Sequence, residues 1–137
     1  MNENYTRQHQ DVRVENGIQY GDLEEYIDYE YLRKNTGINL ANLANLSKAP
    51  AMPDSVKMEV KKLTNSTLLY WQTPKIGKVK GYYVLVRETT SAFWQRKIFT
   101  AETEMRLPYS KDNYFFAVQS VNETGNESLP VVPLPGR

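Results

Sequence analysis

The sequence contains no cysteine and only one histidine in 137 residues. Without cysteine, neither a disulfide framework nor a thiolate zinc site can form, and the redox compartment stays open. No run of about 18 apolar residues occurs, which argues against a membrane-spanning helix. The first 30 residues also lack the basic start and the apolar stretch of a secretory signal peptide. No export signal is therefore visible within these residues.

A large net charge of either sign is also missing, since 17 Lys and Arg against 16 Asp and Glu leave a formal charge of +1. This balance argues against a nucleic-acid-binding protein. The first 30 residues nevertheless carry eight acidic and two basic side chains. Two readings stay open for this asymmetry: two separately solvated surfaces, or an acidic leader that docks on a basic face of the remaining chain.

Two segments with different sequence patterns precede the main domain. Residues 1–27 are polar, with Gly17 and Gly21 as turn points, and predict an irregular leader. Residues 28–47 predict a helix, because Asp28 can cap the first turn and apolar side chains recur every three or four residues. These are Leu32, Thr36, Leu40, Leu43 and Leu46. Such an unpartnered face predicts a homodimer through helix 28–47.

From Asp54 onward the apolar pattern changes to a period of two, after a proline-containing linker at residues 50–53. Turn-forming clusters separate the alternating runs every 8 to 15 residues or so, which is typical of an antiparallel β-sandwich. The expected structural core comprises Trp71, Tyr82, Val84, Val86, Tyr114, Phe116 and Val118. The fold class predicted for the whole chain is therefore mainly β, preceded by an irregular acidic leader and one α-helix.

Three local patterns of the predicted sandwich also match a known family. They are Trp71 at the end of the second strand, Gly-Tyr-x-Val-x-Val-Arg at residues 81–87, and Tyr-x-Phe-x-Val at residues 114–118. Together they resemble a fibronectin type III domain. The resemblance implies that Trp71 packs between the sheets and that the Tyr114 hydroxyl bonds back to the preceding corner. Leu107 lies seven positions before Tyr114, where six is usual.

The predicted sandwich offers no catalytic residue, because a serine nucleophile needs a base and the chain's one histidine lies outside it. Phe93 and Trp94 are a possible contact patch for a protein or a glycan, although cross-strand packing explains such aromatics equally well. Asn-x-Ser/Thr triplets begin at five positions. Without evidence of a eukaryotic secretory source, these triplets count as chance matches. They begin at Asn4, Asn45, Asn65, Asn122 and Asn126.

The single histidine, His9, lies in the leader, within NYTRQHQDVRVENGIQYGD followed by EYIDYEYLRKNTGINLANLANLSKAP. This stretch resembles the C-terminal end of the catalytic domain in the leucyl-aminopeptidase-like dizinc metallopeptidases, some of which also carry such a sandwich. The resemblance implies that His9 is the last zinc ligand of the intact parent and that Asp11 is an acidic residue of the same loop. It divides the chain into a peptidase remnant at 1–49, a linker at 50–53 and a sandwich at 54–137.

The same resemblance implies an incomplete enzyme. A two-zinc site needs further ligands and a general base, which these residues do not supply, so the chain alone is expected to bind no cofactor and to be inactive. Zinc, the peptide substrate and an upstream peptidase domain belong to the intact parent, which is expected to be exported. The alternative is a free-standing fibronectin type III interaction or glycan-binding protein with a helical oligomerisation element.

Overall fold

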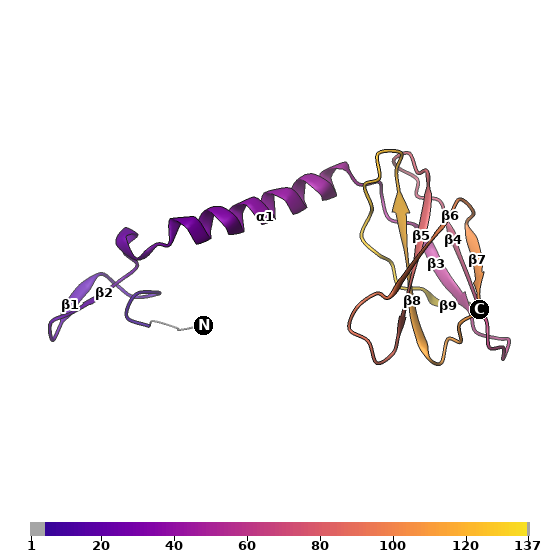
Figure 1. The fold of residues 1–137 in the computed structure, drawn as a ribbon, viewed down its shortest axis with the longest axis horizontal. Helices are drawn as coiled ribbons and strands as arrows, with labels where there is room; N and C mark the ends of the chain where they lie inside the picture. Colours follow the sequence, from indigo (N-terminus) through magenta and orange to yellow (C-terminus); the bar gives the residue numbers. More distant parts are fainter. Residues whose placement is uncertain (1–4, 137) are drawn as a thin grey trace. The chain divides into compact units, whose positions relative to one another are not determined.

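The computed structural model describes residues 5–136 of the chain (Figure 1). The described chain forms two compact units, which divide between Asn42 and Leu43 and are described separately below. None of the helices in residues 5–136 combines the length and the apolar character that a membrane crossing requires. The first unit contains the hairpin β1 (Arg13–Glu15) and β2 (Ile18–Tyr20), the 3₁₀ turn η1 (Glu24–Tyr26) and the start of helix α1 (Tyr29–Lys48).

The β1–β2 hairpin corrects the prediction of an irregular leader. Its two-residue turn is formed by Asn16 and Gly17, whose φ angles of 52° and 77° are both positive. This is the turn geometry whose twist matches that of paired antiparallel strands, and Asn-Gly is its preferred sequence. The guanidinium of Arg13 stacks on the ring of its cross-strand partner Tyr20, 4.3 Å from the ring centroid. The hairpin therefore forms around its Asn-Gly turn, although the hydrophobic alternation of its two strands is weak.

Helix α1 agrees with the sequence prediction to within one residue at each end. Asp28 is its N-cap, because the Tyr31 amide donates to Asp28 Oδ1 at 3.0 Å. The helix ends before Ala49, the residue that precedes Pro50 and is therefore disfavoured from helical geometry. No residue of α1 is buried in the described chain. The exposed fractions of its leucines run from 47% at Leu46 to 65% at Leu40 and Leu43.

The second unit contains a β-sandwich of two sheets (Figure 1). One sheet has the order β7-β4-β3-β9 and the other has the order β6-β5-β8. The strands are β3 (Asp54–Glu59), β4 (Thr67–Gln72), β5 (Gly81–Glu88), β6 (Arg96–Thr100), β7 (Glu104–Leu107), β8 (Tyr114–Val121) and β9 (Leu134–Gly136). All neighbouring strands pair antiparallel except β3 and β9, which are parallel.

Strands β6 and β9 were not predicted, and both lie at sheet edges. Strand β6 has no buried residue, so its hydrophobic alternation is weak. Strand β9 contains Pro135, which is compatible with an edge position because proline cannot donate a ladder hydrogen bond. The apolar alternation continues through Val60 and Thr103, but these two residues lie just beyond the ends of β3 and β7.

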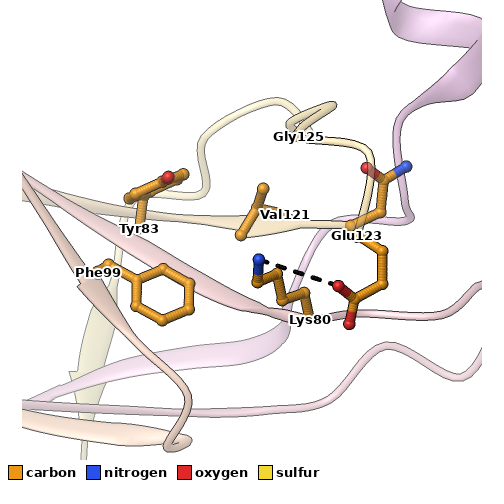
Figure 2. A pocket seen from close by; sticks show the side chains of 7 residues that line it. Lys80, Tyr83, Phe99, Val121, Glu123 and Gly125 are labelled. Carbon is orange, nitrogen blue, oxygen red and sulfur yellow. Dashed lines mark ion pairs between the residues drawn. The ribbon is translucent and has the colours of Figure 1, made fainter.

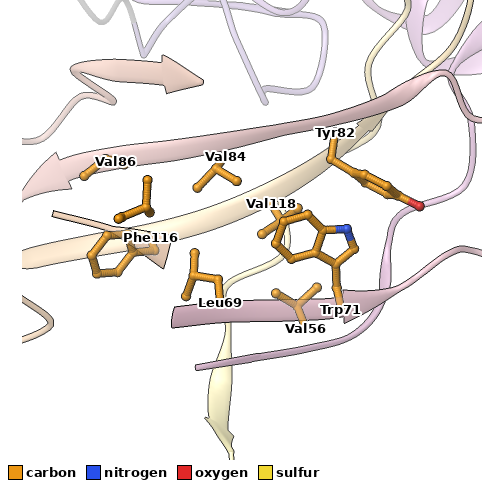
Figure 3. Packing of buried hydrophobic residues seen from close by; sticks show 9 residues of the cluster. Val56, Leu69, Trp71, Tyr82, Val84, Val86, Phe116 and Val118 are labelled. Atoms are coloured by element: carbon orange, nitrogen blue, oxygen red, sulfur yellow. The ribbon is translucent and has the colours of Figure 1, made fainter. Parts of the chain in front are cut away.

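The core lies between the two sheets (Figure 3). Leu69 on one sheet faces Val84 and Val118 on the other, and all three side chains have no exposed surface. Trp71 is 4% exposed and meets Tyr82 edge to face, with ring centroids 5.3 Å apart. This interleaving of apolar side chains from two sheets is the main stabilising feature of the sandwich.

The corner before β8 differs from the one that the resemblance implied. None of the hydrogen bonds found among residues 5–136 involves the Tyr114 hydroxyl, and its ring instead tilts against Tyr109 at 5.0 Å. Thr67, which is 1% exposed, donates its hydroxyl to the Tyr109 carbonyl at 2.7 Å and ties the corner to β4. The additional residue between Leu107 and Tyr114 lengthens the connection, so a different pair of groups closes it.

Candidate functional site

The loop around His9 is closed by two long-range hydrogen bonds. The His9 amide donates to Asp22 Oδ1 at 2.9 Å, and the Gly21 amide donates to the Thr6 carbonyl at 3.0 Å. His9 has a φ of 54°, a left-handed conformation that is uncommon for residues other than glycine. Its side chain is exposed. The fold therefore fixes the backbone that carries the imidazole while leaving the side chain accessible.

The donor set around His9 does not make up a zinc site. Residues 5–136 contain no group of three or more His, Cys, Asp or Glu side chains that could hold a metal ion. The Asp22 carboxylate already accepts the His9 amide, and Asp11 is exposed in the same loop. A catalytic zinc ion needs about three protein ligands and an open position. His9 can therefore supply at most one ligand to a site completed by other residues.

A second candidate site is a pocket of about 230 Å³ on the β6-β5-β8 sheet (Figure 2). Figure 2 shows Tyr83 and Phe99 on one side of Val121 and the Lys80–Glu123 pair on the other. The charged groups of this pair lie 3.9 Å apart. A β-carbon on Gly81 would lie 2.7 Å from the Phe99 ring, so only glycine lets Phe99 cover this part of β5. The sequence had singled out neither Lys80 nor Glu123.

The predicted contact patch, Phe93 and Trp94, lies in the loop between β5 and β6. Phe93 is 81% exposed, whereas Trp94 is 38% exposed. The Arg87 guanidinium lies between two rings, 5.5 Å from the centroid of Trp94 and 4.5 Å from that of Phe115. Trp94 is therefore partly engaged within the sandwich, and Phe93 is the more available of the two side chains.

The turn after β8 is organised by the Asn122 side chain. Its Oδ1 atom accepts from the amides of Thr124 at 3.2 Å and Asn126 at 2.9 Å. Its Nδ2 atom donates to the Lys48 carbonyl at 2.9 Å. The sequence indicated a turn here from Asn and Gly content alone, but it could not show that one carboxamide holds the turn together.

Two solved structures resemble the sandwich closely enough to define its fold. A Fn3-like protein from Clostridium thermocellum aligns with a TM-score of 0.51 at 18% identity, over 66% of this chain and 97% of that one. The sandwich has the fibronectin type III fold. The twitchin kinase region from C. elegans aligns with a TM-score of 0.53 at 22% identity, over 63% of this chain and 16% of that one. At these identities the likeness concerns the fold alone.

Relatives that bear the name probable zinc metalloprotease match nearly the whole chain. The protein from Leptosphaeria maculans is 42% identical over 136 residues, which make up 98% of this chain and 32% of that protein. Relatives from Pyrenophora tritici-repentis and Pyricularia oryzae are 38% and 36% identical, with 28% of each covered. The chain thus spans about a third or less of the relatives that it matches. Comparison with protein-family models found no match.

Proposed function

We propose that this chain is the C-terminal part of a zinc-dependent aminopeptidase and that its sandwich is an accessory, stabilising module. The observation that carries this proposal is the 42% identity over nearly the whole chain to a probable zinc metalloprotease of which the match covers 32%. The resemblance of residues 2–49 to the end of a dizinc aminopeptidase domain supplies the finer assignment. The fold supports the accessory role, since fibronectin type III sandwiches carry many unrelated functions and need no active site.

Within this proposal His9 contributes one zinc ligand to a site whose other ligands lie upstream. Asp22 accepts the His9 amide and so holds the loop in the conformation that carries the imidazole. A bound zinc ion would supply an activated water for cleavage of an N-terminal peptide bond. The part played by this chain is to position His9, not to provide the general base.

Replacing His9 in the full-length protein tests this assignment. His9→Ala is expected to lower the bound zinc per molecule and to reduce hydrolysis of aminoacyl-p-nitroanilides about 100-fold or more. Gln8→Ala is the matched control, because Gln8 is also exposed and lies beside His9. An unchanged zinc content and rate in the His9 variant would contradict the proposal.

The size of the natural gene product tests whether an upstream part exists. An immunoblot of source cells with an antibody against the sandwich is expected to give a band well above the mass of 137 residues. A band at that mass would leave His9 without partners for zinc. The interaction-module alternative would then explain the chain better.

The exposed leucines of α1 lead to a proposal about partners. Leu40 and Leu43 are each 65% exposed in the described chain. We propose that the upstream peptidase domain covers this face in the full-length protein, and that the 137-residue chain alone forms a homodimer through it. Light scattering over a concentration series is expected to show a dimer that Leu40→Lys with Leu43→Lys abolishes. A strictly monomeric unmodified chain would contradict the homodimer.

Export is the proposed localisation of the full-length protein. Its support is the resemblance to aminopeptidases that act outside the cytoplasm, and the signal would lie outside these residues. Fractionation of a source culture is expected to recover the protein in the medium. Recovery only in the cell lysate would argue against export.

The exposure of Phe93 favours a second candidate function, contact with a protein or glycan through the Phe93–Trp94 patch. Calorimetric titration of the full chain with oligosaccharides would detect glycan binding, and Phe93→Ala is expected to remove it. Phe115→Ala is a useful control, because Phe115 is also an exposed aromatic but packs on Arg87. Binding that survives Phe93→Ala would exclude this patch.

A further inference from the structure

The turn between β3 and β4 carries a modification signal that the aminopeptidase proposal does not use. Residues 65–67 read Asn-Ser-Thr, which is the acceptor triplet for N-linked glycosylation. We propose that Asn65 carries an N-linked glycan and that Asn122 and Asn126 do not. This inference rests on the proposed export, and it adds a covalent site on the sandwich. Of the two remaining triplets, the one at Asn4 begins outside the described residues, and the one at Asn45 is exposed on α1, outside the sandwich.

Asn65 lies in an exposed turn whose hydrogen bonds are made by other residues. The Thr64 hydroxyl donates to the Ser66 carbonyl at 2.7 Å, and Lys111 Nζ donates to the Lys62 carbonyl at 3.0 Å. Asn65 is exposed, and none of the hydrogen bonds found among residues 5–136 uses its carboxamide. A sugar on Asn65 Nδ2 would therefore break no hydrogen bond of the sandwich.

The apolar surface beside Asn65 supports the same site. Leu63, two residues earlier in the turn, is 95% exposed, the highest value among the exposed large hydrophobic residues of the described chain. An uncovered leucine at a turn tip has no packing explanation within the sandwich. A glycan on Asn65 would shelter this side chain from water and from other proteins.

A glycan on Asn122 would oppose folding, because the folded sandwich already uses this side chain. It is half-buried, and its Nδ2 atom donates to the Lys48 carbonyl at 2.9 Å. A glycosidic bond at this nitrogen would crowd the Lys48 contact and strain a turn that depends on Asn122. Asn126 is also half-buried, and its Oδ1 atom accepts from the Thr124 hydroxyl at 2.8 Å.

The transfer needs a lipid diphosphate-linked oligosaccharide as its co-substrate, and it precedes folding, because the folded sandwich buries the Thr67 hydroxyl of the triplet. The Asn65 amide nitrogen forms a bond to the anomeric carbon, the bond from that carbon to the diphosphate oxygen breaks, and the amide gives up one proton. The relatives come from fungi, which are eukaryotes with a glycosylating secretory pathway. The proposal takes the source of this chain to be a eukaryote of the same kind, in which the triplet is an acceptor rather than a chance match.

Peptide mass spectrometry of the full-length protein from source cultures tests the site. Enzymatic removal of N-glycans in heavy-oxygen water converts a glycosylated asparagine into labelled aspartate. Labelled aspartate is expected at position 65, with unlabelled asparagine at 122 and 126. An unlabelled Asn65 would overturn the inference, and so would label at Asn122 in its place.

Two matched variants, secreted from yeast as the full-length protein, complete the test. Asn65→Gln is expected to lose one glycosidase-sensitive step on a gel while keeping the denaturation midpoint. Asn122→Gln is expected to keep that step and to lower the midpoint. Zinc content and size, measured on the same preparations, separate the glycosylation of Asn65 from the proposed aminopeptidase function. A zinc-containing, exported protein with bare Asn65 overturns this inference alone, whereas a protein retained in cells with bare Asn65 overturns it together with export.

Discussion

At the scale of single residues, Leu69 and Leu63 show how position rather than residue type decides the energy. Leu69 has no exposed surface, and Leu63 is 95% exposed. Leu69→Ala is expected to lower the free energy of unfolding by about 2–5 kcal/mol, through lost burial and a residual cavity. Leu63→Ala is expected to change it by less than about 0.5 kcal/mol. Urea denaturation measures both, and equal losses would contradict the observed core.

Thr67 is a second residue whose environment gives a specific expectation. Its buried hydroxyl donates to the Tyr109 carbonyl at 2.7 Å and closes the corner before β8. Thr67→Val keeps the shape but removes the donor, so a loss of about 1 kcal/mol is expected. Thr67→Ser keeps the hydroxyl and serves as the control for the hydrogen bond. A valine variant as stable as the unmodified chain would show that this bond is not needed.

At the scale of elements, the first turn of α1 depends on its cap. Asp28 Oδ1 accepts the Tyr31 amide. Asp28→Ala is expected to destabilise the helix by about 1 kcal/mol and to speed hydrogen exchange at the first turn. Asp28→Asn retains an acceptor and is expected to exchange nearly as slowly as the unmodified chain. Equal exchange in the alanine variant would exclude a role for the cap.

The same turn has a pH dependence. The side chain of Arg33 lies 2.8 Å from the Glu30 carboxylate and lowers the pKa of Glu30. Because the folded pKa lies below the unfolded one, the pair stabilises α1 above the unfolded pKa and is lost as the pH falls through the folded pKa. An NMR titration is expected to show a Glu30 pKa below its ordinary value, which Arg33→Gln raises. An Arg33→Gln variant with the same Glu30 pKa would contradict this cause.

Among the strands, hydrophobic periodicity predicted those that bury one face in the core. The alternation of Tyr82, Val84 and Val86 identified β5, because every second side chain points into the core. The β1–β2 hairpin was missed, although Asn16-Gly17 signalled its turn, because its residues are largely exposed. Strand β9 was missed because its parallel pairing with β3 depends on residues about 77 positions apart, Lys57 and Leu134.

At the scale of the whole molecule, the core residues all come from the second unit. Residues 48–137 alone are therefore expected to fold cooperatively, with a free energy of unfolding within about 1 kcal/mol of that of the full chain. Keeping Lys48 preserves the carbonyl that Asn122 contacts. Calorimetry of both lengths measures the comparison. A shorter chain that fails to fold would show that the leader or α1 is part of the sandwich's stability.

The sequence by itself determined the sandwich, its core and helix α1, because periodic burial and helix capping are local properties of the chain. It also singled out His9, whereas the Asn65 triplet counted at that level as a chance match. Only the tertiary structure decided that Thr67 closes the corner before β8 and that the Asn122 carboxamide is hydrogen-bonded, whereas no hydrogen bond found in residues 5–136 uses that of Asn65. These outcomes depend on contacts between distant segments, which no local pattern encodes.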